Sequence, residues 1–405
     1  MNNSEKSIDQ SKMESRPNRV QTPIIEYVNL LLDRAIQAQA SDLHLEPFEK
    51  ECTVRYRIDG VLHEMKPLPL SLAAPMISRM KLLADLDIAE QRLPQDGRFQ
   101  RSSEQGPVDF RISTLPTPWG ESVVLRLLDR RSLFPSLKAL QLPSSLHQEI
   151  TTFLAQPHGL FIVTGPTGSG KTTTLYACLH ELNARGLKLL SAEDPVEYEV
   201  EGVMHVSVHD EIGLSFQRLL RSFLRHDPDG IMIGETRDLA TAQMALQASL
   251  TGHLVLTSLH TNDAAGALVR LIDMGLDPLM ISTTLRCVLA QRLIRKICTA
   301  CRTPYQPDET LLASLGLNPK ELTHHIWYHG TGCSHCHHSG YRGRTALFEL
   351  LSMHDELRLL INQYASHDQL RKKAVELGMK TLREDARRLV LEGITTVEEV
   401  GLLGR

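Results

Sequence analysis

Eight consecutive residues of this chain have the types and spacing of a phosphate-binding loop. The segment fits the pattern G-x-x-x-x-G-K-[ST]. Its residues are Gly165, Pro166, Thr167, Gly168, Ser169, Gly170, Lys171 and Thr172. Glycines let backbone N–H groups curl around an anion, and the N-terminal end of a following helix favours negative charge. The lysine would reach the β- and γ-phosphates and the last hydroxyl would bind Mg²⁺. The loop therefore predicts a site for ATP and Mg²⁺.

The residues on either side of the loop predict the strand and helix that position it. Residues 159–164 form an apolar run typical of a buried strand, and the helix-forming run 173–182 opens with Thr173, which we add to the nucleotide-binding residues. Over about 158–297, apolar runs alternate with helical patterns. This alternation predicts an α/β fold with a mostly parallel sheet covered on both faces. Its expected strands are 159–164, 187–192, 229–233 and 253–258.

Carboxylates follow two of the later strands, at the edge where parallel sheets place their ligands. Glu193 and Asp194 come after residues 187–192, and such a pair can orient an attacking water or hold Mg²⁺ through water. The alternative is a helix cap and turn, because Asp-Pro commonly opens turns. Glu235 ends the next apolar run and is the best candidate for polarising the water, with a surface glutamate as the alternative.

Two histidines, His253 and His260, flank the last predicted strand. An isolated histidine beside a strand is more often structural than catalytic. Because this apolar strand has one at each end, we expect one of the two to contact the γ-phosphate.

Together these motifs resemble those of the ATPase superfamily that powers type II secretion and type IV pili. The resemblance covers roughly 23–405, and the glycine before Glu235 is a trait of that family. Beyond the phosphate-binding loop, the matching segments are the start of the second N-terminal domain at 40–47, the Asp box at 191–197, the Walker B region at 224–238 and the His box at 251–262. The resemblance implies a RecA-like P-loop ATPase domain, an N-terminal PAS-like α+β domain, a zinc-binding insert and a helical C-terminal region.

The resemblance also implies roles for individual residues. Glu193 and Glu235 would assist attack by water, and His253 and His260 would lie at the phosphate end of the sheet. The family works as a ring of six, with ATP between the two domains of a subunit and N-terminal arginines closing the site. Arginine stabilises the charge of phosphoryl transfer. The candidate arginines are Arg98, Arg111 and Arg126. The alternative is that these are strand-face arginines paired with Asp or Glu, and the three cannot all be essential.

Four cysteines in two C-x-x-C pairs match a tetrahedral Cys₄ zinc site. They are Cys298, Cys301, Cys333 and Cys336. The closed ligand set favours a structural Zn²⁺, although the gap between the pairs exceeds that of the usual zinc ribbon. A nearby histidine (His335, His337 or His338) could replace one thiolate, and free thiols are the remaining alternative. In the resembling family, secretion and pilus-extension ATPases carry this module, whereas retraction motors generally lack it.

Periodicity divides the rest of the chain. A helical pattern at 24–36, alternation between 41 and 63 with a turn at Asp59-Gly60, a second helical pattern at 72–88 and further alternation to 127 predict a small α+β domain. The expected divisions are a disordered tail at 1–22, the N-terminal domain at 23–133, a connector at 134–157, the P-loop ATPase domain at 158–297, the zinc module at 298–346 and a helical C-terminal domain at 347–405.

The sequence weighs against two alternative functions. A nucleic-acid translocating ring is disfavoured because 44 basic and 48 acidic residues leave a net charge of −4 and aromatics make up only 5%. We therefore expect no direct contact with nucleic acid. A non-hydrolysing nucleotide-binding regulator is disfavoured by the intact Glu235 and His260.

The predicted function is that of a homo-hexameric ATPase driving assembly of pilin-like subunits by an inner-membrane platform protein. No export signal or transmembrane run is apparent, which predicts a cytoplasmic protein attached to the inner membrane through partners. Fuller family members dock through a further N-terminal domain, whereas about 22 polar residues precede the shared part here. The usual docking is therefore not expected. Protein secretion, pilus extension and DNA uptake all remain open as the client process.

Overall fold

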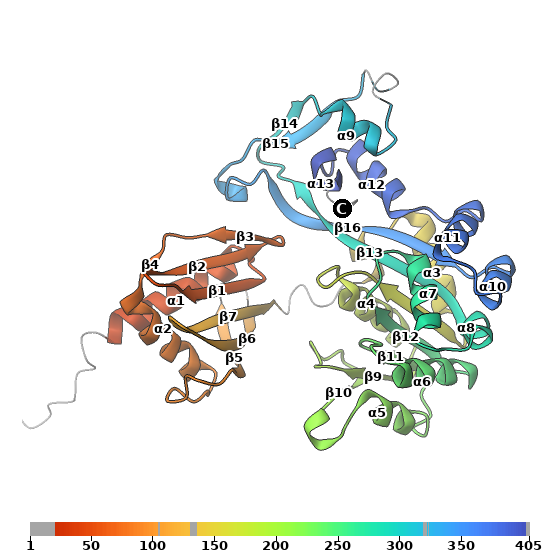
Figure 1. Ribbon diagram of the computed structural model, residues 1–405, viewed down its shortest axis with the longest axis horizontal. Coiled ribbons are helices and arrows are strands. Elements are labelled where there is room, and N and C mark those ends of the chain that lie inside the picture. Colours follow the sequence, from red (N-terminus) through yellow and green to blue (C-terminus); the bar gives the residue numbers. More distant parts are fainter. Residues whose placement is uncertain (1–20, 104–105, 130–135, 319–321, 323, 402–405) are drawn as a thin grey trace, which may run out of the picture. The chain divides into compact units, whose positions relative to one another are not determined.

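The computed structural model describes residues 21–103, 106–129, 136–318, 322 and 324–401 (Figure 1). The chain divides into two compact units, 1–131 and 132–405. The tail predicted at 1–22 lies outside the described residues except for its last two, which begin helix α1 (Gln21–Gln37). No helix in the described part of the chain is both long and apolar enough to cross a membrane.

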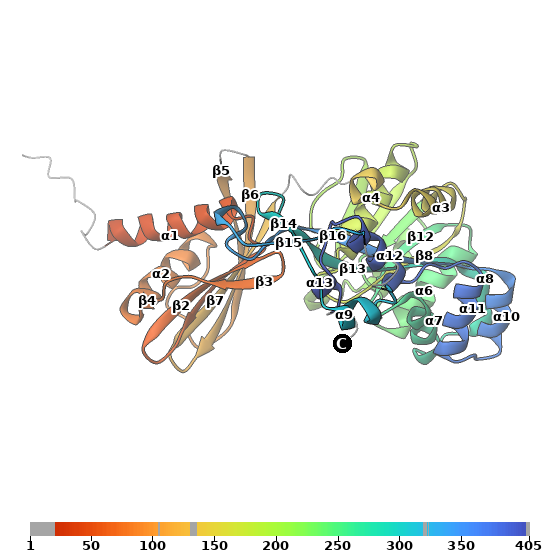
Figure 2. The same cartoon turned by 90° about the horizontal axis from the view of Figure 1, so that it is seen from above.

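The N-terminal unit is an antiparallel sheet with α1 and α2 (Leu70–Leu83) on one face (Figure 2). The strands follow the order β3-β2-β1-β7-β6-β5, and β4 pairs with β2. They are β1 (Asp42–Pro47), β2 (Glu51–Ile58), β3 (Val61–Glu64), β4 (Leu68–Pro69), β5 (Gln95–Ser103), β6 (Gly106–Thr117) and β7 (Gly120–Asp129). Alternate strand residues such as Phe110 and Leu125 are buried beneath helix residues such as Leu32 and Met76. This arrangement confirms the predicted α+β class.

Two local features decide where elements of this unit end. Asp59 and Gly60 both have positive φ, 50° and 86°, and join β2 to β3 in the tight turn that the sequence predicted. The second helix, expected over 72–88, instead ends at Leu83, because Asp85 takes a left-handed conformation with φ of 55°.

The second unit is built on a seven-stranded sheet with the order β10-β9-β11-β12-β8-β13-β16. All neighbouring pairs are parallel except β13 with β16. The strands are β8 (Gly159–Thr164), β9 (Leu189–Glu193), β10 (Val203–Ser207), β11 (Gly230–Ile233), β12 (Leu254–Leu259), β13 (Leu285–Ile297) and β16 (Tyr341–Ser352). The predicted mostly parallel α/β fold is confirmed, and its four expected strands are present within about two residues at each end.

Helices cover both faces of this sheet, because strands such as β8 bury every side chain. One face carries α3 (Ser144–Leu154) and α4 (Lys171–Asn183), which pack on Phe161 and Val163. The other face packs on Leu160 and Ile162. Its helices are α5 (Phe216–Phe223), α6 (Leu239–Leu250), α7 (Ala264–Asp273) and α8 (Pro278–Thr284). Because α3 belongs to this core, the described part of the segment predicted as a connector at 134–157, residues 136–157, packs with the ATPase unit.

The two longest strands of this sheet, β13 and β16, were not predicted. β16 crosses the expected boundary between zinc module and C-terminal domain at 346/347 and pairs with β13 along most of its length. Its second half, residues 345–351, consists largely of good helix formers, so its pattern resembles the start of the helical tail. Burial between sheet neighbours overrides that propensity.

The remaining elements lie between or after these two strands. A small sheet pairs β14 (Arg302–Tyr305) with β15 (Trp327–Gly330) beside α9 (Glu309–Ser314). The C-terminal helices are α10 (Asp355–Asn362), α11 (His367–Glu376), α12 (Leu382–Leu391) and α13 (Val397–Gly401). In Figure 1, α10 lies beside α8 and α11 beside α7, so the C-terminal helices extend the cover of one sheet face.

Candidate nucleotide site and metal centre

The predicted phosphate-binding loop joins the end of β8 to the first turn of α4. Gly168 and Gly170 have φ of 78° and 87°, which residues with a Cβ rarely adopt. At Gly165 a Cβ would lie 2.4 Å from the carbonyl oxygen of Gln291, so the backbone approach there requires glycine. Thr172 and Thr173 are exposed in the first turn of the helix.

Lys171 is folded back onto this loop. Its Nζ donates hydrogen bonds to the carbonyl oxygens of Gly165 and Pro166, at 2.9 and 3.1 Å. Burial lowers the pKa of Lys171, and the Glu235 carboxylate partly offsets that effect. The same Nζ lies 3.4 Å from Nδ1 of His260, so the lysine stands between the loop and the end of β12.

Glu235 and His260 meet beside this lysine, because β11 and β12 are neighbours and end at the same edge. An oxygen of Glu235 lies 3.5 Å from Nε2 of His260. Arg237 pairs with the other oxygen of Glu235 and lies 3.7 Å from Asp194. The His260 imidazole thus bridges Lys171 and Glu235. In this arrangement the imidazole could contact a bound phosphate, and the carboxylate could orient a water.

Glu193 is buried, with only 2% of its surface exposed. One oxygen accepts a hydrogen bond from the Tyr176 hydroxyl on α4. The other accepts from the Ser191 hydroxyl at 2.5 Å and lies 2.9 Å from Nδ1 of His205. Burial and the Glu193 charge raise the pKa of Tyr176 far above its ordinary value. Both carboxylate oxygens are thus engaged within the protein, and a role in water attack stays a prediction.

His253 does not lie where the resemblance placed it. It precedes β12, and its carbonyl accepts from the backbone N–H of Gly159 at the start of β8. The phosphate loop follows the opposite end, where Leu259 pairs with Thr164. Nδ1 of His253 is 2.9 Å from the carbonyl oxygen of Ala248. The expectation that both histidines lie at the phosphate end is therefore wrong for His253, because the strand between them is extended.

The three candidate arginines share one row of the N-terminal sheet. Arg98 pairs with Arg111, and Arg111 with Arg126, across β5, β6 and β7. Paired residues in a sheet point to the same face, which here is opposite to the buried Phe110. Nε of Arg126 donates to Asp42 at 3.0 Å, so the alternative of a strand-face arginine paired with an acid describes Arg126.

The four predicted zinc ligands come together in one cluster. The four sulfur atoms all lie within 4.8 Å of one another, and the close pairs are 3.7 to 3.9 Å apart. Tetrahedral bonding at about 2.3 Å would separate sulfurs by about 3.8 Å. Burial alone would raise the pKa of Cys336, but backbone N–H donors of Cys333 and Gly340 lower it to about 6. These donors stabilise a thiolate, so the geometry fits a metal.

Comparisons with known proteins agree with this architecture. The family model of the type II/IV secretion system protein matches residues 18–402. Type II secretion system protein E of Pseudomonas aeruginosa is 48% identical over 378 residues, which cover 93% of this chain and 75% of that protein. The chain belongs to the type II/IV secretion system protein family.

Further similar proteins are named as ATPases or as a pilus motor. The type IV pilus assembly ATPase PilB of Myxococcus xanthus is 46% identical over 93% of this chain and 67% of that protein. The solved pilus retraction motor PilT, with ADP bound, superposes with a TM-score of 0.61 at 26% identity, covering 93% of this chain and 96% of that one. The ATPase DotB of Legionella pneumophila gives 0.69 at 22% identity, covering 96% and 98%, and shows the fold alone. This chain is an ATPase of that family.

Gln291 is a residue of this secretion ATPase that the sequence did not reveal. It is buried on β13, where its Nε2 donates to the carbonyl of Ser169 at 2.8 Å. Its Oε1 accepts from the Thr174 hydroxyl at 2.7 Å. The side chain therefore clamps the loop to the first turn of α4. A glutamine inside an unpredicted strand carries no motif that would have identified it.

We expect Gln291→Leu to weaken nucleotide binding and to lower the free energy of unfolding. The change leaves a buried carbonyl and hydroxyl without partners, at about 1–3 kcal/mol for each. Chemical denaturation and titration with a fluorescent ATP analogue measure the two effects. Gln363→Leu, at an exposed glutamine of the same unit, is the control. Unchanged affinity and stability in Gln291→Leu would refute the clamp.

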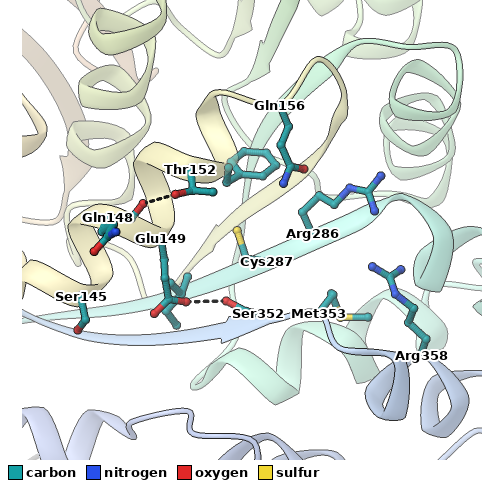
Figure 3. Close-up of a pocket in the computed structure, with 12 residues that line it drawn as sticks. Ser145, Gln148, Glu149, Thr152, Gln156, Arg286, Cys287, Ser352, Met353 and Arg358 are labelled. Atoms are coloured by element: carbon teal, nitrogen blue, oxygen red, sulfur yellow. Dashed lines mark hydrogen bonds between the residues drawn. The ribbon is translucent and has the colours of Figure 1, made fainter.

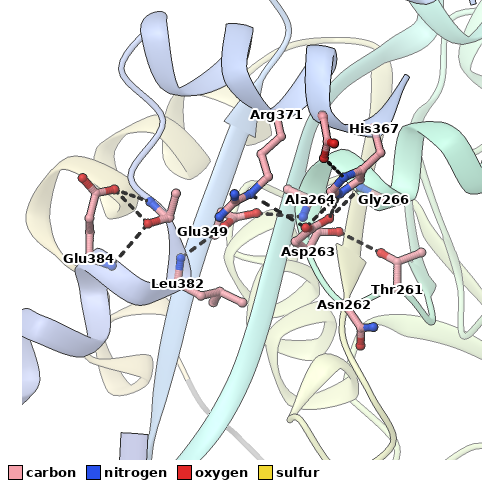
Figure 4. Close-up of polar contacts among 12 residues, drawn as sticks. Thr261, Asn262, Asp263, Ala264, Gly266, Glu349, His367, Arg371, Leu382 and Glu384 are labelled. Carbon is pink, nitrogen blue, oxygen red and sulfur yellow. Dashed lines mark hydrogen bonds and ion pairs between the residues drawn. The ribbon is translucent and has the colours of Figure 1, made fainter. Parts of the chain in front are cut away.

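The chain segment after His260 connects the loop to the C-terminal helices (Figure 4). The Thr261 hydroxyl lies 2.7 Å from that of Thr164, at the end of β8. Asp263 caps α7 and pairs with His367 on α11 at 2.9 Å, with Arg371 4.0 Å away. The neighbouring Glu349, which is buried and accepts from two helix N-termini, has its pKa raised by burial. These contacts fix the segment that presents His260.

The His367 pair should make stability depend on pH. Hydrogen bonding to Asp263 raises the pKa of His367 above its ordinary value of 6.5, while burial opposes the rise and Asp368 adds to it. Because the folded pKa is the higher, the stabilisation is complete below about pH 6.5 and is lost as pH rises through the folded value. The imidazole is 39% exposed, which limits the effect to less than about 1 kcal/mol.

We therefore expect His367→Gln to destabilise the protein at about pH 5.5 but not at about pH 9. Urea denaturation at both values measures the difference. His335→Gln, at an exposed histidine, is the control for general effects of losing an imidazole. Equal destabilisation at both pH values would show that the pair contributes only packing.

Proposed function

We propose that this secretion ATPase is the motor subunit of a homo-hexamer that powers type II protein secretion or type IV pilus assembly. The observation that carries the proposal is the bridge from Lys171 through His260 to Glu235, at 3.4 and 3.5 Å. It joins the phosphate loop to a candidate water-activating carboxylate, as hydrolysis requires. The names of the relatives, a type II secretion system protein and a type IV pilus assembly ATPase, support secretion or pilus assembly as the process that the motor would drive.

In the proposed reaction the loop holds ATP by its backbone N–H groups. Lys171 moves its Nζ from the loop carbonyls to the phosphates, which offer stronger, charge-assisted bonds. The Thr172 hydroxyl would hold Mg²⁺, which neutralises phosphate charge when bound. Glu235 orients the attacking water and accepts its proton, and His260 contacts the γ-phosphate. Arg237 holds the Glu235 carboxylate in place until the substrate arrives.

Further residues have proposed supporting roles. Glu193 ties β9 to α4 through Tyr176 and so fixes the helix that carries Lys171. We also propose that the arginine row of the N-terminal sheet, with Arg98 and Arg111, supplies positive charge to the nucleotide. Arg126, held by Asp42, would support that row.

The Cys₄ cluster is proposed to hold a structural Zn²⁺. Its four thiolates leave no open position for a reacting molecule. The exposed His335 and His338 lie outside the group of side chains close enough to share one ion among the described residues. The geometry therefore favours Cys₄ over Cys₃His ligation, and the ion would fasten the ends of β13 and β16.

The proposal is tested by turnover and assembly together. The purified chain should hydrolyse ATP, and native mass spectrometry with a non-hydrolysable ATP analogue should give a particle of six chains. Affinity capture from membranes should bring an inner-membrane platform protein of a secretion or pilus system. A chain that binds ATP without turnover, alone and after addition of membranes, would instead indicate a regulator, and stimulation by DNA would indicate a translocase.

A further inference from the structure

A pocket lies at the edge of the main sheet away from the nucleotide site (Figure 3). It has a volume of about 560 Å³ and is lined by α3, the start of β13, the end of β16 and Arg358 of α10. β13 begins beside the start of β8, whereas the phosphate loop follows the other end. The length of β8 separates the two sites by roughly 17 Å.

One cation of this pocket, Arg286, packs against a glycine. A Cβ on Gly159 would lie 2.5 Å from Cγ and 3.1 Å from Nε of Arg286. The arginine stem therefore lies directly over the glycine backbone. Nε of Arg286 is buried and has no hydrogen-bond partner among the described residues. A buried donor that lacks an acceptor costs free energy.

A second cation, Arg358, lies close to the first. Figure 3 shows the two guanidinium groups on the same side of the pocket, with Gln156 beside Arg286. Burial lowers the pKa of Arg358, and the charge of Arg286 lowers it further. The two like charges repel each other, so they are expected to be more stable with an anion between them.

The acids nearby neutralise these charges only in part. Arg358 lies 3.6 Å from Asp355, but that carboxylate is 98% exposed, so solvent screens the pair. Glu149 accepts a hydrogen bond from Ser352 at 2.9 Å, on the other side of the pocket in Figure 3. The corner that contains the two arginines is therefore left positive.

We propose that this pocket is a second, oxyanion-binding site that takes the phosphate group of a small molecule between Arg286 and Arg358. The volume lies within the range of small-molecule sites, about 300–1,000 Å³, and exceeds what inorganic phosphate alone would fill. Arginine forks match phosphate oxygens in pairs. The Gln156 amide and the apolar wall formed by Phe153 and Leu350 would contact the remainder of the ligand. This site is independent of the motor function proposed above.

The test first removes binding at the phosphate loop by the Lys171→Ala substitution. In a Lys171→Ala chain, isothermal titration with inorganic pyrophosphate, and separately with ADP, should show one saturable site per chain. Adding Arg286→Gln or Arg358→Gln should weaken binding about tenfold or more, because each removes a charge-assisted donor. Equal affinity for both probes would assign recognition to phosphate alone, and tighter ADP binding would add contacts with the nucleoside. Both results support the site.

Controls separate this result from residual binding at the loop. Arg383→Gln, at an exposed arginine of α12 outside the pocket, should leave affinity unchanged. Thermal melting should show that all variants fold. Absence of saturable binding in the Lys171→Ala chain would overturn the proposal. Binding that persists unchanged in both Arg286→Gln and Arg358→Gln would overturn it equally, because it would then belong to the phosphate loop.

Discussion

Glu235→Gln should reduce the rate of ATP hydrolysis by about 10²–10⁴-fold, the usual contribution of a positioned general base. The amide keeps the shape of the side chain and can still bond His260, but it cannot accept a proton from water. Because Glu235 forms no part of the phosphate loop, ATP affinity should stay within a few-fold of the original. Steady-state phosphate release and titration with an ATP analogue separate the two quantities.

A matched control and a second variant make this prediction specific. Glu201→Gln, at an exposed glutamate of the same unit, should leave turnover unchanged. Lys171→Ala should instead lose both binding and turnover, since its Nζ lies at the loop and is the group proposed to bind the phosphates. Normal hydrolysis by purified Glu235→Gln would remove the residue from the mechanism and turn attention to Glu193.

Loss of metal from the cysteine cluster should unfold the module around it. Structural Zn²⁺ contributes about 10 kcal/mol or more to the folding of small zinc-binding modules at neutral pH. Cys336→Ser removes a ligand whose sulfur also accepts the backbone N–H groups of Cys333 and Gly340. Elemental analysis should find one zinc per chain originally and much less than one in the variant, and limited proteolysis should then cut within 298–340.

The neighbouring histidines provide the control. His335→Ala should keep one zinc per chain and the original protease resistance, because the four cysteines form a complete set. Zinc loss in that variant would instead support Cys₃His ligation. Full protease resistance in a chelator-treated chain with no measurable metal would show that the cluster holds together without an ion.

The sequence predicted the parts of the nucleotide site that follow strong local rules. The loop from Gly165 to Thr172 needs special backbone angles and a lysine, and both appear as a short pattern. Glu235 and His260 were predicted because each directly follows an apolar strand, and neighbouring parallel strands end at one edge. His253 was misplaced because the same motif spans both ends of a strand, and motif membership does not specify which end a residue occupies.

The features that escaped prediction depend on long-range pairing. β16 contains good helix formers and becomes a strand only because β13 lies beside it. Gln291 contacts a loop more than a hundred positions away in sequence, and Asp263 similarly meets His367. Such contacts between distant segments depend on the assembled sheet and leave no local periodicity.

The course of β13 has a mechanical consequence. Arg286 sits near its start, Gln291 clamps the nucleotide loop from its middle, and Cys298 follows its last residue. An extended strand is stiff, and the last two of these residues are roughly 23 Å apart along it. Disorder at the Cys298 end of β13 would therefore disturb the contacts that Gln291 makes with the phosphate loop. We therefore expect nucleotide affinity to fall when the cysteine cluster loses its proposed metal, so zinc content should be measured together with ATPase activity.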